Sequence, residues 1–171
     1  DKDTFCISLD NIKKIKTKKT KVVVITHTYG NIQEVQKIKT WCSRHNIKLI
    51  EDAAEAMGSQ FSGKFAGTFG DIGTFSLHAT KNITTGEGGL IVTNNNKIAS
   101  LLKLYRSHGV LKKRYYHIVP GHNFRITNFQ AAMGLAQIKN KKKIFLRRKM
   151  IYEIYKKELN NDVFQIQKIN T

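Results

Sequence analysis

Residues 21–54 read KVVVITHTYGNIQEVQKIKTWCSRHNIKLIEDAA, and their apolar pattern decides the fold class. The β-branched run at residues 21–30 ends in a glycine, which is typical of a buried strand followed by a turn. Residues 31–46 carry apolar side chains every three or four positions, as an amphipathic helix does. A second strand follows at residues 47–51. A strand, a helix and a strand in this order predict a βαβ unit with parallel strands and a right-handed crossover.

Polar residues mark the ends of these elements. Asn31 is the expected N-cap of the helix, and Glu34 stands three positions later, as in a capping box. Thr26, His27 and Asp52 stand where the two strands end. Because ligands of parallel sheets bind at the carboxyl ends of the strands, we expect the functional site there.

The segment from residue 57 to residue 89 is rich in glycine and contains one expected strand, residues 71–77. Its glycines predict tight turns and close backbone contacts. Beyond it, the pattern predicts a strand at 90–93, a helix at 94–108 and a long helix at 127–159 that bends near Gly134. The first ten and the last ten residues show no partner within the chain. We therefore expect that strands are missing from the open edges of the sheet.

The chain has 171 residues, of which 30 are Lys or Arg and 12 are Asp or Glu, so its formal charge is +18. With 40% hydrophobic residues it has core enough for one globular domain. Such a charge is common in nucleic-acid-binding proteins. The lysines are spread over the whole chain, however, and the dense cluster at residues 139–149 lies on the long predicted helix, where a solvated face explains it. We therefore do not expect a nucleic-acid partner, and an anionic small molecule or a negatively charged protein surface fits the charge as well.

The sequence also argues against membranes, disulfides and metals. No apolar run reaches the roughly 20 residues that a membrane-spanning helix needs, and the first residues lack the apolar core of a signal peptide. We therefore expect a cytoplasmic protein with no membrane partner. Cys6 and Cys42 are too few for a disulfide framework and are expected to be reduced, buried or half-buried thiols. No carboxylate or cysteine accompanies His108, His117 and His122 at ligand spacing, so we expect no metal site.

A lysine in the glycine-rich segment suggests the chemistry. Lys81 follows the strand at 71–77 in the stretch FSLHATKNITTGEGG, where its neighbours are small and uncharged apart from Glu87. A partly desolvated amine of this kind can form an imine with an aldehyde. Pyridoxal 5'-phosphate (PLP) needs such a lysine, and it also needs a carboxylate that keeps its ring nitrogen protonated. Asp52 can be that carboxylate. The simpler interpretation is a solvated lysine and a carboxylate that caps a turn.

Five blocks of sequence carry a resemblance to a known family: EDAAEAMGS, FGDIGTFSLHATK, ITTGEGG, RSHG and HNFRITNFQAAMGLAQI. Their order and spacing resemble those of the DegT-type nucleotide-sugar aminotransferases, PLP-dependent enzymes that act on 4-keto or 3-keto sugars. The resemblance extends over residues 5–159. It implies an α/β fold: a three-layer sandwich with a mostly parallel central sheet, as in the large domain of fold-type I PLP-dependent transferases.

The resemblance implies a role for each of five residues. Lys81 would bind the cofactor covalently and act as general base, and Asp52 would pair with the pyridine nitrogen. Ser76 would contact the cofactor phosphate, although a serine here could also satisfy a turn. Asn123 is similar to an asparagine that reaches the phosphate of the neighbouring subunit in a homodimer. Glu55 stands where members carry Gln, His or Glu near the ring, unless it is a solvated helix residue. A Glu there resembles the perosamine-synthase branch, which aminates a GDP-linked 4-keto-6-deoxymannose.

Family members are considerably longer than this chain. They have an amino-terminal phosphate-binding turn, an aromatic residue that stacks on the ring and a carboxy-terminal small domain, and this sequence contains none of these. The chain therefore resembles the central part of such an enzyme. By this comparison, residues 1–126 belong to the PLP-binding large domain, residues 127–160 form the long helix toward the small domain, and residues 161–171 form a tail.

The implied reaction is the PLP-dependent transfer of an amino group, with glutamate as the expected donor, to the keto group of a nucleotide-linked deoxysugar. Such sugars are built into cell-surface polysaccharides, including lipopolysaccharide. Whether this chain acts alone is left open. Two alternatives remain, a PLP-dependent sugar dehydratase and a non-catalytic remnant of the family. Lys81 weighs against the dehydratase, because a histidine stands at this position in those enzymes.

Overall fold

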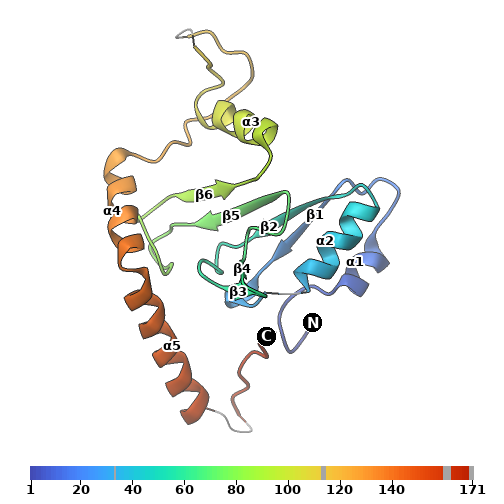
Figure 1. Cartoon of the computed structure of the whole chain (residues 1–171), viewed down its shortest axis with the longest axis vertical. Helices are drawn as coiled ribbons and strands as arrows, with labels where there is room; N and C mark the ends of the chain where they lie inside the picture. The colour runs from blue at the N-terminus through green and yellow to red at the C-terminus, as the bar shows by residue number, and fades with distance from the viewer. Residues whose placement is uncertain (33, 113–114, 160–162, 170–171) are drawn as a thin grey trace.

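The protein is built around a four-stranded sheet with the strand order β1-β2-β5-β6 (Figure 1). β1 (Val22–Thr26), β2 (Lys48–Asp52) and β5 (Ile72–Ser76) run parallel, and β6 (Gly89–Val92) pairs antiparallel with β5. The structure is a computed structural model that describes residues 1–32, 34–112, 115–159 and 163–169. It confirms the predicted α/β fold with a mostly parallel sheet.

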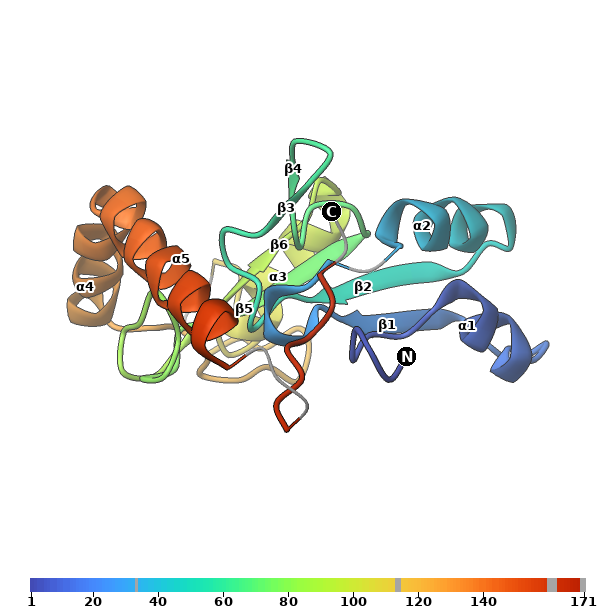
Figure 2. The same ribbon diagram turned by 90° about the horizontal axis from the view of Figure 1, so that it is seen from below.

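One face of the sheet carries the hydrophobic core. α2 (Val35–Arg44) lies over this face, as Figure 2 shows. Side chains alternate along β1, so that Val23 and Ile25 are buried and point toward the helix layer. α1 (Leu9–Ile15), which the sequence pattern did not predict, adds Ile12 to the same cluster. The core therefore lies between the parallel strands and these two helices.

The opposite face of the sheet has no helical layer in the part of the chain that the structure describes. Val22 and Val24 of β1 are 46% and 58% exposed, and Ile91 of β6 is 55% exposed. Val22 and Val24 alternate with the buried residues of β1, and Ile91 lies on the same face because it pairs with Thr74, which is in register with Asp52 and Thr26. Of the three layers expected, the described residues supply the sheet and one layer of helices. We call the uncovered side the open face.

α2 starts later than the sequence predicts. A 3-10 turn, η1 (Thr28–Gly30), follows β1, and Glu34 is the residue before the helix but makes no side-chain capping bond. Asn31 is therefore not the helix cap. Its buried side chain donates instead to the carbonyl oxygens of Thr4 and Lys168. The prediction was wrong here because residues far along the chain compete for the Asn31 amide.

The glycine-rich segment forms tight turns, as expected. It contains a small hairpin of β3 (Gln60–Phe61) and β4 (Lys64–Phe65). Gly67 has a φ of +80°, and a Cβ atom there would lie 2.5 Å from the Phe75 ring. Gly73 in β5 lies against the Gly67 backbone so closely that no larger residue fits. The turn at residues 66–70 can therefore fold directly onto the sheet.

The long helix predicted at 127–159 is two helices, α4 (Asn128–Lys139) and α5 (Lys141–Glu158). α3 (Asn96–Arg106) precedes them, close to its predicted position. The helix axis is interrupted at Asn140 and not at Gly134 as expected. Gly134 is buried, and a Cβ atom there would lie 3.2 Å from the Thr85 side chain. This glycine thus serves close packing of α4 on the loop after β5.

The two ends of the chain contact each other. The Lys168 amide donates to the Asp3 carbonyl at 2.9 Å, and the Gln167 side chain donates to the carbonyls of Thr4 and Thr28. The expectation that the terminal segments have no partner within the chain was therefore wrong. The predicted division into residues 1–126, 127–160 and 161–171 stays a prediction, and its second boundary lies outside the described residues.

Cys6 and Cys42 are buried free thiols, as predicted, and burial raises the pKa of Cys42. Among the residues that the structure describes, no helix combines the length and the apolar character needed to cross a bilayer.

Candidate active site

The carboxyl ends of the parallel strands bring polar side chains together on the open face. Thr26, Asp52 and Thr74 are neighbours in the register of β1, β2 and β5, so they share one face of the sheet. Ser76 lies two residues beyond Thr74 and points to the same side. Asp52 is half-buried, and its Oδ1 accepts a hydrogen bond from the Ala54 amide at 3.1 Å. The structure thus places Asp52 and Ser76 on the same side of adjacent strands.

Lys81 and Glu55 form an ion pair, with Lys81 Nζ 3.6 Å from Glu55 Oε1. Their side chains are 24% and 36% exposed. The other oxygen of Glu55 accepts a hydrogen bond from the Tyr29 amide at 2.9 Å. The sequence did not predict this contact, because the residues around Lys81 in the sequence are uncharged apart from Glu87 and the carboxylate of Glu55 comes from the separate turn after β2. Glu55 is at the same time linked to the turn after β1.

Ser76 ends β5 immediately before the loop that carries Lys81. Its Oγ accepts a hydrogen bond from the His78 amide at 3.2 Å, which leaves the hydroxyl proton available for an anion. The loop closes through Thr85, whose amide donates to the Leu77 carbonyl at 2.9 Å. Lys81 therefore lies in a loop whose two ends are joined next to the sheet.

Asn123 is not brought to this group. It is exposed and pairs through its backbone with Ser107, directly after α3. Within the described residues it makes no hydrogen bond or ion pair with the other four predicted site residues.

A buried pair next to the site was missed by the sequence interpretation. His27 Nε2 lies 2.8 Å from Glu51 Oε2, and both side chains are fully buried. Burial alone would raise the pKa of Glu51, but hydrogen bonds from His27 and from the Gly70 and Gly67 amides lower it below its usual value. The signal was present in the sequence, because strand alternation puts Glu51 on the face opposite to Asp52, among the core residues.

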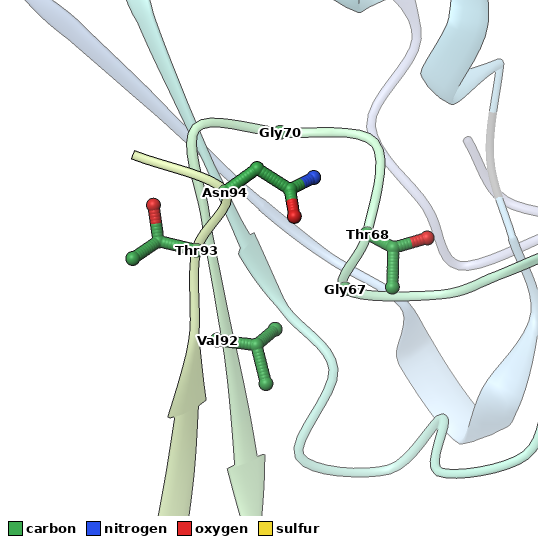
Figure 3. A pocket seen from close by; sticks show the side chains of 6 residues that line it. All are labelled: Gly67, Thr68, Gly70, Val92, Thr93 and Asn94. Carbon is green, nitrogen blue, oxygen red and sulfur yellow. The ribbon is translucent and has the colours of Figure 1, made fainter. Parts of the chain in front are cut away.

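Two other features lie apart from the site. A small pocket is lined by Gly67, Thr68, Gly70, Val92, Thr93 and Asn94 (Figure 3). Val92 pairs with Gly73, so the pocket borders the face of the sheet opposite to Asp52. Within the described part of the chain, no three His, Cys, Asp or Glu residues gather as a metal site. His117 Nδ1 instead lies 2.6 Å from the His108 carbonyl oxygen.

The residues at the carboxyl ends of β2 and β5 fit PLP in their chemistry. An amine, Lys81, can bind an aldehyde, and two carboxylates, Asp52 and Glu55, can hold protons beside it. Ser76 offers a hydroxyl donor for a phosphate. All four come from the carboxyl ends of β2 and β5 or the turns that follow, where ligands of parallel sheets bind.

Comparisons with known proteins agree with this chemistry. The family model for the DegT/DnrJ/EryC1/StrS aminotransferase family matches residues 1–170. The chain is 40% identical over 162 residues to the GDP-perosamine synthase of Escherichia coli O157:H7, which covers 94% of this chain and 44% of that protein. The chain thus spans about half the length of the curated relatives it matches.

Solved structures show the same relationship. Helicobacter pylori PseC, an aminotransferase of pseudaminic acid biosynthesis, superposes with a TM-score of 0.87 at 33% identity, covering 92% of this chain and 43% of PseC. A GDP-4-keto-6-deoxymannose-3-dehydratase with a trapped PLP-glutamate geminal diamine superposes with a TM-score of 0.89 at 31% identity, covering 99% of this chain and 49% of the dehydratase.

Proposed function

Because the chain belongs to the DegT/DnrJ/EryC1/StrS aminotransferase family, we propose that it forms the lysine-bearing part of a PLP-dependent sugar aminotransferase. The observation that carries the proposal is the position of Lys81. Its amine contacts Glu55 beyond the carboxyl ends of β2 and β5, the same ends at which Asp52 and Ser76 lie. An amine, two carboxylates and a hydroxyl at one end of parallel strands suit an amino-group transfer.

The substrate in this proposal is a nucleotide-linked deoxysugar with a keto group, of the perosamine type. The similarity to a GDP-perosamine synthase supports it, and Glu55 agrees with that branch. The trapped PLP-glutamate species in the dehydratase neighbour supports glutamate as the amino donor. The product would serve cell-surface polysaccharide synthesis, such as lipopolysaccharide synthesis, from the cytoplasm.

Each residue has a distinct task in this reaction. When bound, PLP supplies an electron sink for the substrate carbon that loses a proton. Lys81 would hold the cofactor, and its freed amine would carry a proton from and to the substrate. Asp52 would keep the ring nitrogen protonated, and Ser76 would donate its hydroxyl to the phosphate. Glu55 retains the Lys81 ammonium beside the site through their ion pair.

We further propose that the working unit is a homodimer. Asn123 is exposed and, among the described residues, makes no hydrogen bond or ion pair with Lys81, as expected if it contributes to the phosphate site of a second subunit. A dehydratase is the second candidate, because two solved structures of dehydratases superpose on this chain with TM-scores of 0.90 and 0.89. The amine of Lys81 favours the transferase, since dehydration on this cofactor uses a histidine at that position.

Reductive trapping tests the proposal. The chain is mixed with equimolar PLP, reduced with borohydride and digested, and the modified lysines are identified by mass spectrometry. We expect the label on Lys81 at more than ten times the level of any other lysine. Lys81→Met removes the label, whereas the control Lys97→Met, at an exposed lysine in the first turn of α3, leaves it unchanged. A label spread evenly over the surface lysines would refute the assignment.

A further inference from the structure

The buried pair of His27 and Glu51 lies directly behind the proposed site. Glu51 and Asp52 are consecutive residues of β2, so their side chains leave the strand on opposite faces. His27 follows β1, and its backbone amide donates to the Asp52 carbonyl at 3.0 Å. The histidine thus contacts Asp52 through its backbone and Glu51 through its ring.

Glu51 also fixes the turn that leads into β5. Gly67 donates its amide to Oε2 at 2.8 Å, and Phe69 donates to Oε1 at 2.6 Å. The Gly70 amide binds the same oxygen as Phe69. With His27, four donors surround one buried carboxylate. The residues that follow β1, precede β5 and form β2 are therefore tied to a single side chain.

The ring of His27 completes this arrangement. Within the described residues, His27 Nδ1 has no hydrogen-bond partner, although it is buried. Nε2 must be the donor to the carboxylate, because an ionised carboxylate only accepts. Among the described residues, the bond to Glu51 is therefore the one hydrogen bond that the His27 ring makes.

We propose that Glu51 and His27 are positioning residues for the open-face site, which set the orientation of the Asp52 carboxylate and the turn that carries Glu55. His27 directly precedes η1, whose Tyr29 amide binds Glu55, so a displaced His27 shifts both carboxylates. That this orientation serves an active site rests on the proposed function. The orientation of the Asp52 carboxylate and of the turn with Glu55 is itself a property of the chain without cofactor.

Hydrogen exchange on the chain alone tests the placement. The Ala54 amide donates to Asp52 Oδ1, so its exchange rate reports the carboxylate orientation. We expect His27→Leu, which removes the donor, to speed exchange at Ala54, Gly67 and Phe69 at least tenfold. His27→Gln keeps an N–H donor and should stay within about threefold of the parent chain. The control Ile38→Val weakens the core of α2 without touching the pair.

If His27→Leu and Ile38→Val change the Ala54 rate equally, the pair is structural only and the proposal is wrong. Glu51→Gln provides a second test if His27→Leu does not fold. The hydrogens of the new side-chain amide would face the backbone donors, so the same backbone amides should exchange faster.

A spectroscopic measurement uses PLP labelled with ¹⁵N in the ring. We expect the ring-nitrogen shift to move toward the unprotonated value in His27→Leu, as in Asp52→Asn, and to stay at the parent value in His27→Gln.

The two proposals fail in different ways. If the parent chain gives no labelled Lys81 and no PLP spectrum, the proposed function fails while the exchange rates still decide the role of the pair. If PLP binds but the ring-nitrogen shift is the same in His27→Leu and the parent, the positioning role is refuted and the proposed function stands.

Discussion

At the scale of single residues, Asp71 joins three elements through one carboxylate. Its Oδ2 accepts hydrogen bonds from Lys39 of α2 and from the Leu49 amide of β2, both at 2.9 Å, and Lys48 lies 3.5 Å from Oδ1. Burial would raise the pKa of Asp71, but the Leu49 amide and the two lysines lower it below the usual value. The folded state therefore favours the ionised carboxylate.

The free energy of unfolding should fall in acid for this reason. The folded chain binds fewer protons at Asp71 than the unfolded chain, so this contribution is complete above about pH 4 and is lost as the pH falls below it. The lowered pKa of Glu51 likewise makes the free energy of unfolding fall in acid. We expect Asp71→Asn to cost about 1–3 kcal/mol at pH 7 and almost nothing near pH 2. Urea unfolding at both pH values measures this difference.

Asp10→Asn is the matched control. Asp10 pairs with Lys13 at 3.1 Å on the surface, where it is 80% exposed, so its loss should change stability by less than about 1 kcal/mol at either pH. Equal effects of the two substitutions would show that Asp71 does not link the three elements.

Residues of the site differ in how far the sequence could predict them. The positions of Asp52 and Ser76 at the ends of strands were predicted correctly, because strand ends follow from the apolar pattern. The contact between Glu55 and Lys81 could not be predicted, since it depends on how two separate turns meet. Asn31 was misjudged for the same kind of reason. Its competing partner, Lys168, is 137 residues away in the sequence.

At the scale of elements, α4 is attached to the loop that carries Lys81. Gln137 Oε1 accepts a hydrogen bond from the Thr84 amide at 3.0 Å, and its Nε2 donates to the Thr84 carbonyl at 2.6 Å. Gly134 lets the helix approach Thr85. The helix therefore acts as a support for the far side of the Lys81 loop.

Gln137→Ala should loosen this support. It leaves both backbone groups of Thr84 without their partner, and we expect a loss of about 1–3 kcal/mol in the free energy of unfolding. The Thr84 amide should exchange faster by more than tenfold, and trapping of PLP at Lys81 should slow. Lys139→Ala, an exposed change in the last turn of the same helix, is the control and should alter neither. Unchanged exchange at Thr84 would contradict the role of Gln137.

The helices also show where periodicity fails. α4 is apolar on most of its surface, so the pattern continues into α5 without a visible stop, and the interruption at Asn140 was not predicted. The Asn140 side chain donates to the Ala136 carbonyl, and the Asn140 backbone amide donates to the Gln137 carbonyl. Such a local bond ends one helix while the next begins, and it leaves no change in the apolar periodicity.

At the scale of the whole molecule, apolar surface and charge oppose each other. The open face exposes Val22, Val24 and Ile91, and α5 exposes Leu146 and further apolar side chains. Exposed apolar surface of this kind marks interaction sites. A formal charge of +18 keeps copies of the chain apart at low ionic strength. The balance between the two should therefore depend on salt.

Self-association of the chain should strengthen as salt is added. The screening length falls from about 30 Å at 0.01 M to about 8 Å at 0.15 M, which removes repulsion but leaves apolar contacts intact. Binding to contaminating nucleic acid would weaken over the same range. Sedimentation of nuclease-treated chain at several salt concentrations separates the two. Val24→Lys on the open face should reduce association more than the same charge added elsewhere, for which Gln36→Lys is the reference because Gln36 is exposed on α2, which covers the other face. A monomer at every salt concentration would refute both the homodimer and the association of copies through the open face.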